Sequence, residues 1–413
     1  MGIKNLNKIL EKHSPSAFKL LPFSSFYSKR IAIDAVNFMF ITWSISYKQT
    51  VNCTDVTTEA PDRSETMKLW LKQLQSFIRR LLSRGITPVF IFDGKSPNEK
   101  AETQKKRRES KQKASEKLAI KMDELSTVDI LERTPDMIED VRKLLRQEGY
   151  PLTSEINFFK SILEAIGIPI LQATGEAEQL CSYLCIEGQV EAVYSTDTDN
   201  LTHGCPILIT GITRPFRNTD TGNIEEHFEV VILKNILSET NFSFPMFVDL
   251  CIMCGCDYNT NIYRVGYITA YKLIQQWKSI DNLPSKYDIS CLNHNKCREL
   301  FLYCKSTNLL SIPNLSLDID PNNIINSGRD ILEPFGLEAW LQELMTLYEI
   351  VPKPTSNPIT RPPTKVKLML NSSEPVQCNT SNKTSSTVLS NQSNSIKRLS
   401  VIEQFINSNL HLL

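Results

Sequence analysis

The chain has 413 residues, of which 41% are hydrophobic, so it is long enough for one sizeable core-forming domain and accessory segments. Its 46 basic and 46 acidic residues give a net charge of zero, but ten Lys/Arg and only four Glu lie between Lys95 and Lys121. No apolar run approaches the roughly 18 residues that cross a bilayer, and MGIKNLNKIL lacks a secretory core. We therefore expect a soluble intracellular protein with no membrane partner and with a local basic surface suited to phosphate.

The eleven cysteines are scattered and odd in number, which favours free thiols in an intracellular chain. One group has spacings compatible with a zinc site: Cys291, His294, Cys297 and Cys304. Cys297 and Cys304 also lie seven residues apart, which places them on one apolar helix face. Zinc binding and core packing both remain open for this group.

Two short β-branched and aromatic runs, residues 31–35 and 86–94, indicate buried parallel strands. Asp34 and Asp93 lie at their C-terminal ends. Residues 65–84 between them have apolar side chains at helical spacing and end at a glycine, which predicts a helix. The order strand, helix, strand predicts a βαβ unit with a right-handed crossover. Ligands of such sheets bind beyond the strand C-termini, where these two acids lie.

The next segment, residues 95–150, is charged and helix-prone without strand character. Residues 155–168 predict a helix, and residues 168–174 predict a strand. Another helix is expected to begin near Gly175. Its first turn contains Glu176 and Glu178, where the helix dipole favours negative charge.

Two further strands are expected at residues 191–199 and 206–212, and the first of them ends in Asp197 and Asp199. Residues 244–255 form an apolar run that predicts a helix, followed by Asp257. The chain then reads as mainly helical to residue 350. These elements predict an α/β fold with a mostly parallel central sheet flanked by helices.

The C-terminal composition changes to Pro, Ser, Thr and Asn beyond Val351. Such a segment buries too little apolar area to offset its chain entropy, so residues 351–395 are expected to be disordered. Residues 396–413 include the apolar sequence RLSVIEQFINSNL, which suggests a short recognition motif.

Seven carboxylates thus stand where apolar runs stop, and the simplest explanation is that they converge in the folded protein. No lysine adjacent in sequence neutralises them, so they would repel one another unless divalent cations lie between them. Oxygen ligands without a His/Cys set favour magnesium or manganese over zinc. A carboxylate pocket that holds two such ions suits phosphodiester cleavage.

Several separate blocks resemble the flap endonuclease and XPG family of structure-specific 5′-nucleases. These blocks are MGIKNL, IAIDA, FDGKSP, GEAEQ, STDTDNLTHG and FVDLCIMCGCDY. The resemblance covers roughly residues 1–280. The short separation between the blocks of Asp93 and Glu176 is similar to that of the flap endonuclease branch. The resemblance implies a nuclease core of the PIN-like class with a basic helical arch and a helix–two-turn–helix-like element.

The resemblance also implies roles for individual residues. The first Mg²⁺ would be held, directly or through water, by Asp34, Asp93, Glu176 and Glu178. The second would be held by Asp197, Asp199 and Asp257, with Glu178 near both ions, and Mn²⁺ could substitute. Lys100 and Arg107 match the family's basic pair on the arch. Their spacing of seven residues independently places them on nearly the same helix face, from which both could stabilise charge on the scissile phosphate.

Further residues are expected to contact DNA. Gly2 lies in the N-terminal block that the family places near its active site, and Phe40 stands where the family has an aromatic that stacks on a base. Core packing of Phe40 is the alternative. The remaining candidates are basic or lie in the helix–two-turn–helix-like segment: Lys105, Lys106, Arg108, Arg264, Gly266 and Lys272.

That last segment departs from the family. Arg264 stands at the position of a glycine, and Tyr267, Ile268 and Thr269 replace a proline and a basic pair. A non-glycine residue does not easily adopt positive φ, so the family's K⁺ site becomes doubtful. Weaker or differently placed duplex binding is expected.

The tail resembles the family's motif for the sliding clamp (PCNA) only in Ile402 and Phe405, and a terminal helix that packs on its own domain is the alternative. The predicted regions follow the chain order. They are an N-terminal nuclease region (1–94), a basic arch (95–150), an internal nuclease region (151–280), a helical C-terminal part (281–350), a linker (351–395) and the tail motif (396–413).

The resemblance therefore predicts a 5′-flap DNA endonuclease of replication and repair that binds branched DNA. It is expected to act as a monomer, in the nucleus or at a viral site of DNA replication. A 5′→3′ exonuclease or a four-way-junction resolvase of the same family stays open, because residues 260–272 are unusual. A non-catalytic relative would be expected to have lost at least one of the seven acids, and none is replaced.

Overall fold

The computed structural model describes residues 2–217, 224–302 and 321–352. All of these residues belong to one structural unit. The expected disordered linker and the tail with Ile402 and Phe405 lie outside the described residues.

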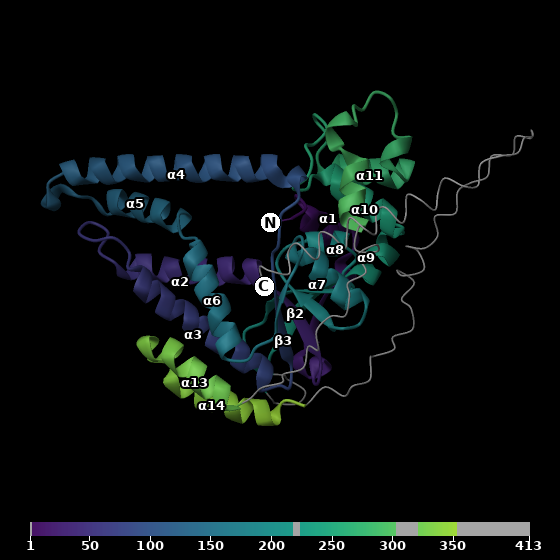
Figure 1. Cartoon of the computed structure of the whole chain (residues 1–413). Coiled ribbons are helices and arrows are strands. Elements are labelled where there is room, and N and C mark those ends of the chain that lie inside the picture. Colours follow the sequence, from purple (N-terminus) through teal and green to yellow (C-terminus); the bar gives the residue numbers. More distant parts are fainter. Residues whose placement is uncertain (1, 218–223, 303–320, 353–413) are drawn as a thin grey trace, which may run out of the picture. The chain divides into compact units, whose positions relative to one another are not determined.

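A seven-stranded sheet forms the centre of this unit (Figure 1). Five neighbouring strands are parallel, and two further strands extend one edge in antiparallel fashion. The mostly parallel sheet predicted from the sequence is therefore confirmed, whereas the antiparallel extension was not predicted. In spatial order the strands are β1 (Phe18–Pro22), β9 (His227–Ile232), β6 (Ile207–Ile212), β5 (Ala192–Tyr194), β2 (Arg30–Asp34), β3 (Thr87–Phe92) and β4 (Ile170–Gln172).

The sheet is covered by helices on both faces, as the continuous burial of successive residues along β2 and β3 requires. Ile31 and Ile33 of β2 join the core cluster that contains Trp43 and Trp70, whereas Ala32 is equally buried but lies outside that cluster. The first face is covered by α2 (Ala35–Cys53), α3 (Arg63–Leu82) and α6 (Thr153–Ala165), and α7 (Ala177–Ile186) contacts β2, β3 and β5 from the other side (Figure 1).

Two helices, rather than the single predicted one, connect β2 to β3. The second, α3, matches the helix expected at residues 65–84. The first, α2, has 19 residues and was missed. Its sequence is rich in β-branched and aromatic residues, which favour strands in isolation. It is helical because Asp34 caps its N-terminus through the Asn37 amide and because tertiary packing buries one face.

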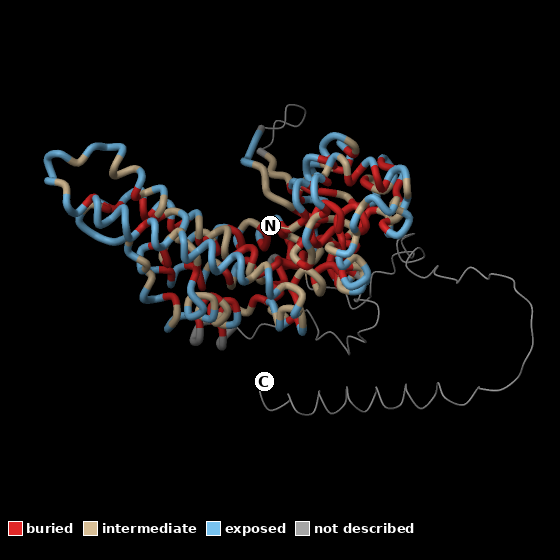
Figure 2. Tube along the Cα trace, turned by 90° about the horizontal axis from the view of Figure 1, so that it is seen from above, coloured by how far each residue is buried: buried red, intermediate tan, exposed pale blue. Residues whose placement is uncertain are grey.

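The charged segment after β3 forms the expected helical arch. A short turn, η3 (Asn98–Lys100), leads into the 27-residue helix α4 (Ala101–Thr127), and α5 (Pro135–Gln147) returns toward the body. Only Leu118 and Leu125 of α4 are buried, because they face α5. Figure 2 shows most of the arch as exposed and the central sheet with its helices as buried.

The remaining N-terminal and central elements pack around the antiparallel edge and the ends of the strands. They are α1 (Leu6–His13), the hairpin strands β7 (Phe216–Arg217) and β8 (Ile224–Glu225), α8 (Asp199–Thr202), α9 (Leu233–Thr240) and α10 (Phe244–Cys254). The last of these, α10, ends at Gly255, as predicted from the apolar run 244–255. Gly255 has φ +101°.

The described part after Tyr258 is mainly helical, as expected. Its helices are α11 (Tyr267–Trp277), α12 (His294–Leu302), α13 (Pro321–Leu332) and α14 (Glu338–Ile350). A partly buried ion pair joins α12 to α10: Arg298 donates two hydrogen bonds of 2.7 Å each to the buried Asp249 carboxylate. In the part of the chain that the structure describes, no helix has the length and apolarity to cross a bilayer.

The turn before α11 corrects one expectation. Arg264 adopts φ +58°, so the left-handed conformation that a non-glycine residue does not easily adopt is present. Gly266 has φ −88° and open space where a Cβ would lie. The arginine therefore occupies the turn at a conformational cost of about 1–2 kcal/mol.

Arg264→Gly is expected to raise the free energy of unfolding by up to about 1 kcal/mol, because glycine removes the backbone strain at this position. Glycine also gives the unfolded chain more conformational entropy, which offsets part of this stabilisation. Thermal unfolding measures the change. The control, Thr269→Gly inside α11, should instead lower the free energy of unfolding by about 0.3–0.5 kcal/mol. A destabilised Arg264→Gly variant would show that the side chain holds the turn.

Candidate active site

The acids predicted from the strand ends do gather at the C-terminal ends of the parallel strands. Asp34 ends β2, and its side chain accepts hydrogen bonds from the Asn37 amide (3.1 Å) and the Ser195 hydroxyl (2.9 Å). Asp93 follows β3 and accepts from the Ala177 amide at 2.7 Å. Parallel register brings these strand ends together, so acids 59 positions apart in sequence become neighbours.

The helix after β4 supplies two more carboxylates. Glu176 is the N-cap residue of α7, and Glu178 lies in its first turn. One oxygen of Glu176 accepts from the Lys100 ammonium and the other from the Tyr258 hydroxyl. By contrast, Oε2 of Glu178 is buried without any hydrogen-bond partner.

The turn after β5 carries Asp197 and Asp199, both almost fully buried. Asp197 accepts from the Asp199 amide at 3.0 Å, and its own amide donates to Ser195 Oγ at 3.0 Å. One oxygen of Asp199, Oδ1, is buried and unpartnered. A buried acceptor without a donor is costly, so this oxygen and Glu178 Oε2 mark a place suited to a cation.

The N-terminal segment reaches the same place, as expected for Gly2. The Ile3 amide donates to Thr198 Oγ1 at 3.0 Å. A Cβ on Gly2 would collide with Asp197 Oδ1 and with Thr198, and Gly2 also has φ +87°. Only glycine fits this close approach without displacing an acid.

The arch contributes the positive charge. Lys100 Nζ lies 3.4 Å from Asp257 Oδ2, in addition to its contact with Glu176. Arg107 Nη2 lies 2.8 Å from both oxygens of Asp257. The hydroxyl of Thr103 also donates to the Asp257 carbonyl at 2.8 Å, so three positions at the start of the arch contact one acid. The predicted pair on one helix face therefore does point at the carboxylates.

Burial and mutual repulsion shift the acids toward their protonated forms. Burial, with the Asp93 carboxylate next, raises the pKa of Asp34 to about 7. Burial and then Asp34, Asp93 and Asp197 raise the pKa of Glu178 well above its ordinary value. Burial and Asp197 act in the same direction on the pKa of Asp199.

The lysine shifts in the opposite direction. Although burial lowers the pKa of Lys100, the carboxylates of Glu176, Glu178 and Asp257 outweigh this effect and raise it. Electrostatic coupling links every one of the seven acids to at least one other. Lys100 and Arg107 together carry two positive charges, which is too few to neutralise seven carboxylates. The site therefore keeps an excess of negative charge that favours the binding of cations.

The donor set fits a hard divalent cation, because it consists of carboxylates, two of whose oxygens are buried and unpartnered. Among the described residues, however, no three His, Cys, Asp or Glu side chains meet in a ready-made coordination geometry. The hydrogen bonds above explain this: several of the oxygens are turned toward Ser195, Tyr258, Lys100 and Arg107. Metal binding would have to exchange these partners.

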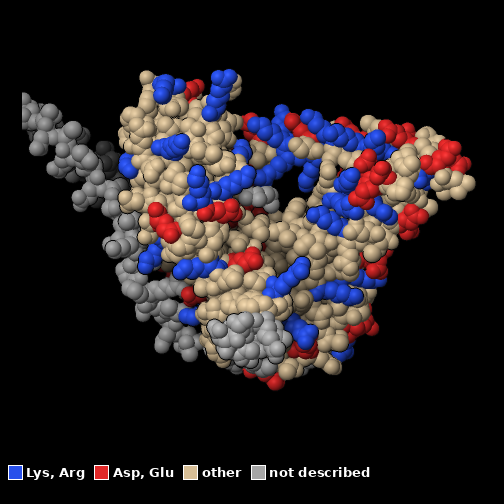
Figure 3. Space-filling view, turned by 180° about the vertical axis from the view of Figure 1, so that it is seen from behind, with Lys and Arg blue, Asp and Glu red and all other residues tan. Residues whose placement is uncertain are grey.

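Other basic candidates lie along the outer surface of the arch. Lys105, Lys106 and Arg108 are exposed, and Lys106 pairs with Glu102 at 2.6 Å, one turn away. Figure 3 shows Lys and Arg side chains along the arch and around an opening between the arch and the body. The structure thus separates these three residues from Lys100 and Arg107, which face the acids.

Phe40 lies on α2 and is half-buried, and it does not belong to the core cluster of the sheet. The Phe40 side chain is therefore not part of the hydrophobic core, which was the alternative to base stacking. The ammonium of Lys111, on α4, lies 5.9 Å from the centre of the Phe40 ring. Phe40 is thus accessible on the side of the arch.

The segment around α11 is exposed but has little charge. Tyr263 is 82% and Ile268 54% exposed, and the Arg264 guanidinium lies 5.1 Å from the centre of the Tyr263 ring. Lys272 is exposed on α11. Arg264 and Lys272 are therefore accessible to a partner, but the structure does not bring them to the carboxylates.

The possible zinc group is not supported by the described residues. His294 Nε2 lies 2.8 Å from Asp281 Oδ1, and Cys297 is buried and directed at the Leu292 carbonyl. No metal-binding group containing Cys291 is found among the described residues. Cys304 lies outside the described residues.

Sequence reasoning missed the residues that hold the acids in place. Tyr258 stands next to Asp257, and Ser195 stands two residues before Asp197, so adjacency to an acid was the available signal. Asn37, three residues after Asp34, accepts from both the amide and the hydroxyl of Thr196. These polar neighbours link the turn after β5 to the start of α2.

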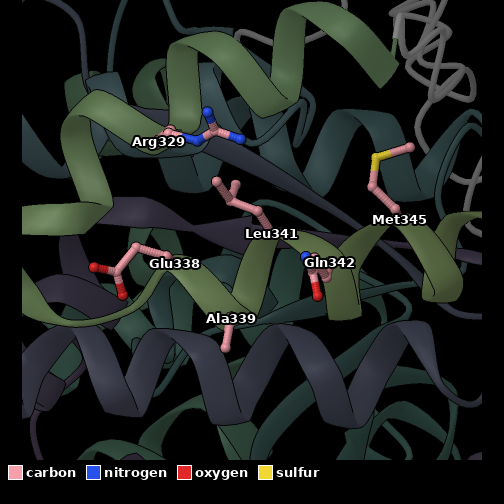
Figure 4. Close-up of a pocket in the computed structure, with 6 residues that line it drawn as sticks. All are labelled: Arg329, Glu338, Ala339, Leu341, Gln342 and Met345. Carbon is pink, nitrogen blue, oxygen red and sulfur yellow. The ribbon is translucent and has the colours of Figure 1, made fainter.

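A separate pocket lies on α13 and α14 and contains none of the candidate residues (Figure 4). Leu341, Met345 and Ala339 give it an apolar lining, and Arg329, Glu338 and Gln342 complete it. It has no cluster of acids or nucleophiles, so it is not the candidate active site.

Acid repulsion predicts an unusual pH dependence for the metal-free protein. Because the folded-state pKa of Asp34 exceeds that of a free carboxyl, folding takes up a proton between about pH 4 and pH 7, and stability falls as pH rises through this window. Asp199→Asn should therefore raise the melting temperature at pH 8, by about 1–2 °C for each kcal/mol relieved in a chain of this length, and have less effect at pH 5.

Asp281→Asn is the matched control. Its hydrogen bonds with Arg298 and His294 outweigh burial and lower the pKa of Asp281, so this substitution should reduce stability above about pH 4. Equal losses of stability at pH 8 for both variants would contradict the electrostatic account of the cluster.

Comparisons with known proteins agree with this geometry. The model for the XPG N-terminal domain matches residues 1–114, and the model for the XPG I-region matches residues 167–257. Flap endonuclease 1 of Cryptosporidium muris is 32% identical over 352 residues, which cover 85% of this chain and 70% of the relative. Flap endonuclease 1 of Entamoeba dispar is 34% identical over 310 residues, covering 73% and 76%.

Two solved structures share the fold. Flap endonuclease-1 from Methanococcus jannaschii has a TM-score of 0.51 at 23% identity and covers 81% of this chain and 96% of its own. Human GEN1, solved in complex with Holliday junction DNA, has a TM-score of 0.52 at 20% identity and covers 85% and 79%. The resemblance and the α/β fold inferred from the sequence are confirmed. This chain belongs to the flap endonuclease branch of the XPG family of metal-dependent DNA nucleases.

Proposed function

We propose that this flap endonuclease cuts at the junction of a 5′ single strand and a duplex, with two Mg²⁺ ions held by its seven carboxylates. The observation that carries the proposal is the cluster itself: buried acids at the C-terminal ends of the strands, two of them with unpartnered oxygens, faced by two cations from the arch. Membership of the family establishes a DNA-cleaving hydrolase. The count of ions, their identity and the residue roles belong to the proposal.

The acids divide into two overlapping ligand groups. Asp34, Asp93, Glu176 and Glu178 come from β2, β3 and α7, and Asp197, Asp199 and Asp257 come from the turns after β5 and α10. Glu178 couples electrostatically to Asp34 and to Asp197, which supports a position between the two groups. When bound, Mg²⁺ supplies water activation and charge neutralisation at the phosphate, and Mn²⁺ has the ligand preference to replace it.

Lys100 and Arg107 would move from carboxylate to phosphate during the reaction. Their present partners, Glu176 and Asp257, are themselves proposed metal ligands. With Glu176 and Asp257 engaged in holding metal, Lys100 and Arg107 would be free to reach the scissile phosphate. Positive charge positioned in this way stabilises the charge that develops during cleavage.

The expected DNA contacts surround this centre. Gly2 permits the chain to lie against Asp197, and half-buried Phe40 offers a ring for base stacking. Lys105, Lys106 and Arg108 form an exposed basic strip on the arch. These surfaces suit a single strand that passes the arch and a duplex that ends at the acids.

A second candidate keeps the active site and changes the preferred DNA. Tyr263 and Ile268 are exposed in the segment where the family carries a basic pair, so duplex contacts there should rely less on charge. This favours weaker flap selectivity, with 5′→3′ exonuclease or four-way-junction cleavage as the alternative. Arg264 and Lys272 remain in this segment for phosphate contact.

Further partners are proposed from the sequence motifs alone. Ile402 and Phe405 would bind a sliding clamp, the enzyme would act as a monomer, and its place would be the nucleus or a viral site of DNA replication. Both motif residues lie outside the described residues. Pull-down with a sliding clamp from the same organism, comparing the full chain with one truncated after residue 395, tests the first of these proposals.

Cleavage of an end-labelled double-flap DNA tests the main proposal. With Mg²⁺, one cut at the flap base is expected, and Asp197→Asn should abolish it while DNA binding in Ca²⁺ survives, because the acid holds metal rather than DNA. A ladder of mononucleotides, or cleavage of four-way junctions alone, would replace the flap assignment. Full cleavage by Asp197→Asn would remove the metal assignment.

Lys100→Ala should lower kcat by about a hundredfold or more, since a positioned charge is lost from the transition state. Affinity for flap DNA in Ca²⁺ should change by less than about threefold. Lys106→Ala, an exposed lysine of the same helix, is the control and should retain most of kcat. Equal effects of both substitutions on kcat would show that Lys100 acts only through the general charge of the arch.

A further inference from the structure

The face of α4 that looks toward the body continues beyond Lys100 and Arg107. Lys111 follows Arg107 by four residues, one helical turn, so it lies on nearly the same face. At 1.5 Å per residue, Lys111 lies about 16 Å along the helix from Lys100, room for several nucleotides of a single strand. Farther along, Leu118 and Leu125 are buried, because there α4 packs on α5.

Two aromatic rings face Lys111 from different elements. Its ammonium lies 3.8 Å from the centre of the Tyr150 ring and 5.9 Å from that of the Phe40 ring. Phe40 belongs to α2, and Tyr150 belongs to the loop between α5 and α6. Both aromatic residues are half-buried, and Lys111 is exposed. A cation between two accessible rings, next to the proposed catalytic lysine and arginine, is a suitable set for nucleotide binding.

The position of Tyr150 is fixed by its neighbours. The guanidinium of Arg63 donates to the Tyr150 carbonyl at 3.3 Å and to both oxygens of Glu155, at 2.9 and 2.5 Å. The same guanidinium lies 4.8 Å from the centre of the Trp43 ring.

The residue before Tyr150 fixes the loop from the other side. Gly149 packs so closely against buried Tyr47 that a Cβ would collide with that ring. The loop backbone is therefore held on two sides while the Tyr150 ring stays accessible. Such a ring loses little conformational freedom when a base stacks on it.

We propose that Tyr150, Lys111 and Phe40 form a binding site for the single-stranded part of the DNA substrate, with Tyr150 as a base-stacking residue that complements Phe40. The inference rests on the proposed function and names the part of the substrate that occupies this side of the arch. In the free protein Lys111 lies over the Tyr150 ring. A base displaces it, and the exposed lysine turns to the adjacent phosphate.

A purely structural role is the competing explanation, since the Lys111–Tyr150 contact also holds the arch to the body. The two differ in what they require of the substrate. A stacking residue needs a base on the flap, whereas an arch contact affects every substrate equally. Abasic nucleotides, which keep the phosphates and remove the bases, separate the two explanations.

The test is kcat/KM on double-flap DNA with a 5′ flap of ordinary nucleotides and on the same DNA with an abasic flap. Tyr150→Ala should lower kcat/KM about tenfold on the ordinary flap and change it less than twofold on the abasic flap. Tyr150→Phe should match the unchanged protein on both. Lys111→Gln should lower kcat/KM on both, because it removes a phosphate contact.

Tyr287→Ala is the matched control, because Lys286 lies 5.2 Å from the centre of that ring in a second Lys–Tyr pair. It should leave both substrates unaffected. An equal loss for Tyr150→Ala on the two flaps, or no loss on either, overturns the stacking site. If thermal unfolding of Tyr150→Ala shows a folding defect, Tyr150→Leu, which keeps an apolar side chain without an aromatic ring, takes its place in the same comparison of the two flaps.

Failure of the proposed function can be told apart from failure of this inference. If the unchanged protein does not cut flap DNA, the proposed function fails. The stacking site is then read from fluorescence anisotropy of a single-stranded oligonucleotide and its abasic counterpart in Ca²⁺. Tyr150→Ala should reduce affinity about tenfold for the first and leave the second unchanged, and any other result overturns the site.

Discussion

Mutual repulsion among seven carboxylates at one edge of a parallel sheet is the constraint on which the rest of this structure depends. Strand register brings Asp34, Asp93 and the turn after β5 together, and the start of α7 adds Glu176 and Glu178. Burial raises the energy of every charge placed there, so the fold accepts instability at this edge. Such a site is stable when cations occupy it, which makes metal binding and folding stability one linked property.

The arch supplies positive charge that offsets part of the negative charge of the acids, through Lys100 and Arg107. Lys100 and Arg107 contact Glu176 and Asp257 across the boundary between arch and body, and Thr103 holds the Asp257 backbone. The same helix face continues to Lys111 between two aromatic rings. Of the three cations on this face, Lys100 and Arg107 contact the acids, whereas Lys111 lies at the two rings.

Much of the site was predictable because its acids follow strands and helix starts, which leave clear signals in sequence. Asp34, Asp93 and Glu178 were found in this way, and periodicity placed Lys100 and Arg107 on one face. Helix α2 was missed because its β-branched and aromatic residues resemble a strand, and only tertiary packing decides its conformation. Tyr258, Ser195 and Tyr150 carry no pattern of their own. Their roles depend on long-range contacts, with Glu176, Asp34 and Lys111 respectively, that no local spacing encodes.

Isothermal titration calorimetry with Ca²⁺ at pH 7, repeated in buffers of different ionisation enthalpy, tests the central claim most directly. If crowded carboxylates share protons until cations replace them, the unchanged protein should bind two ions and release protons as it does so. Glu178→Gln should weaken both binding events, because Glu178 stands between the two ligand groups. Binding of two ions with no proton release, or no ion binding at all, would contradict the account.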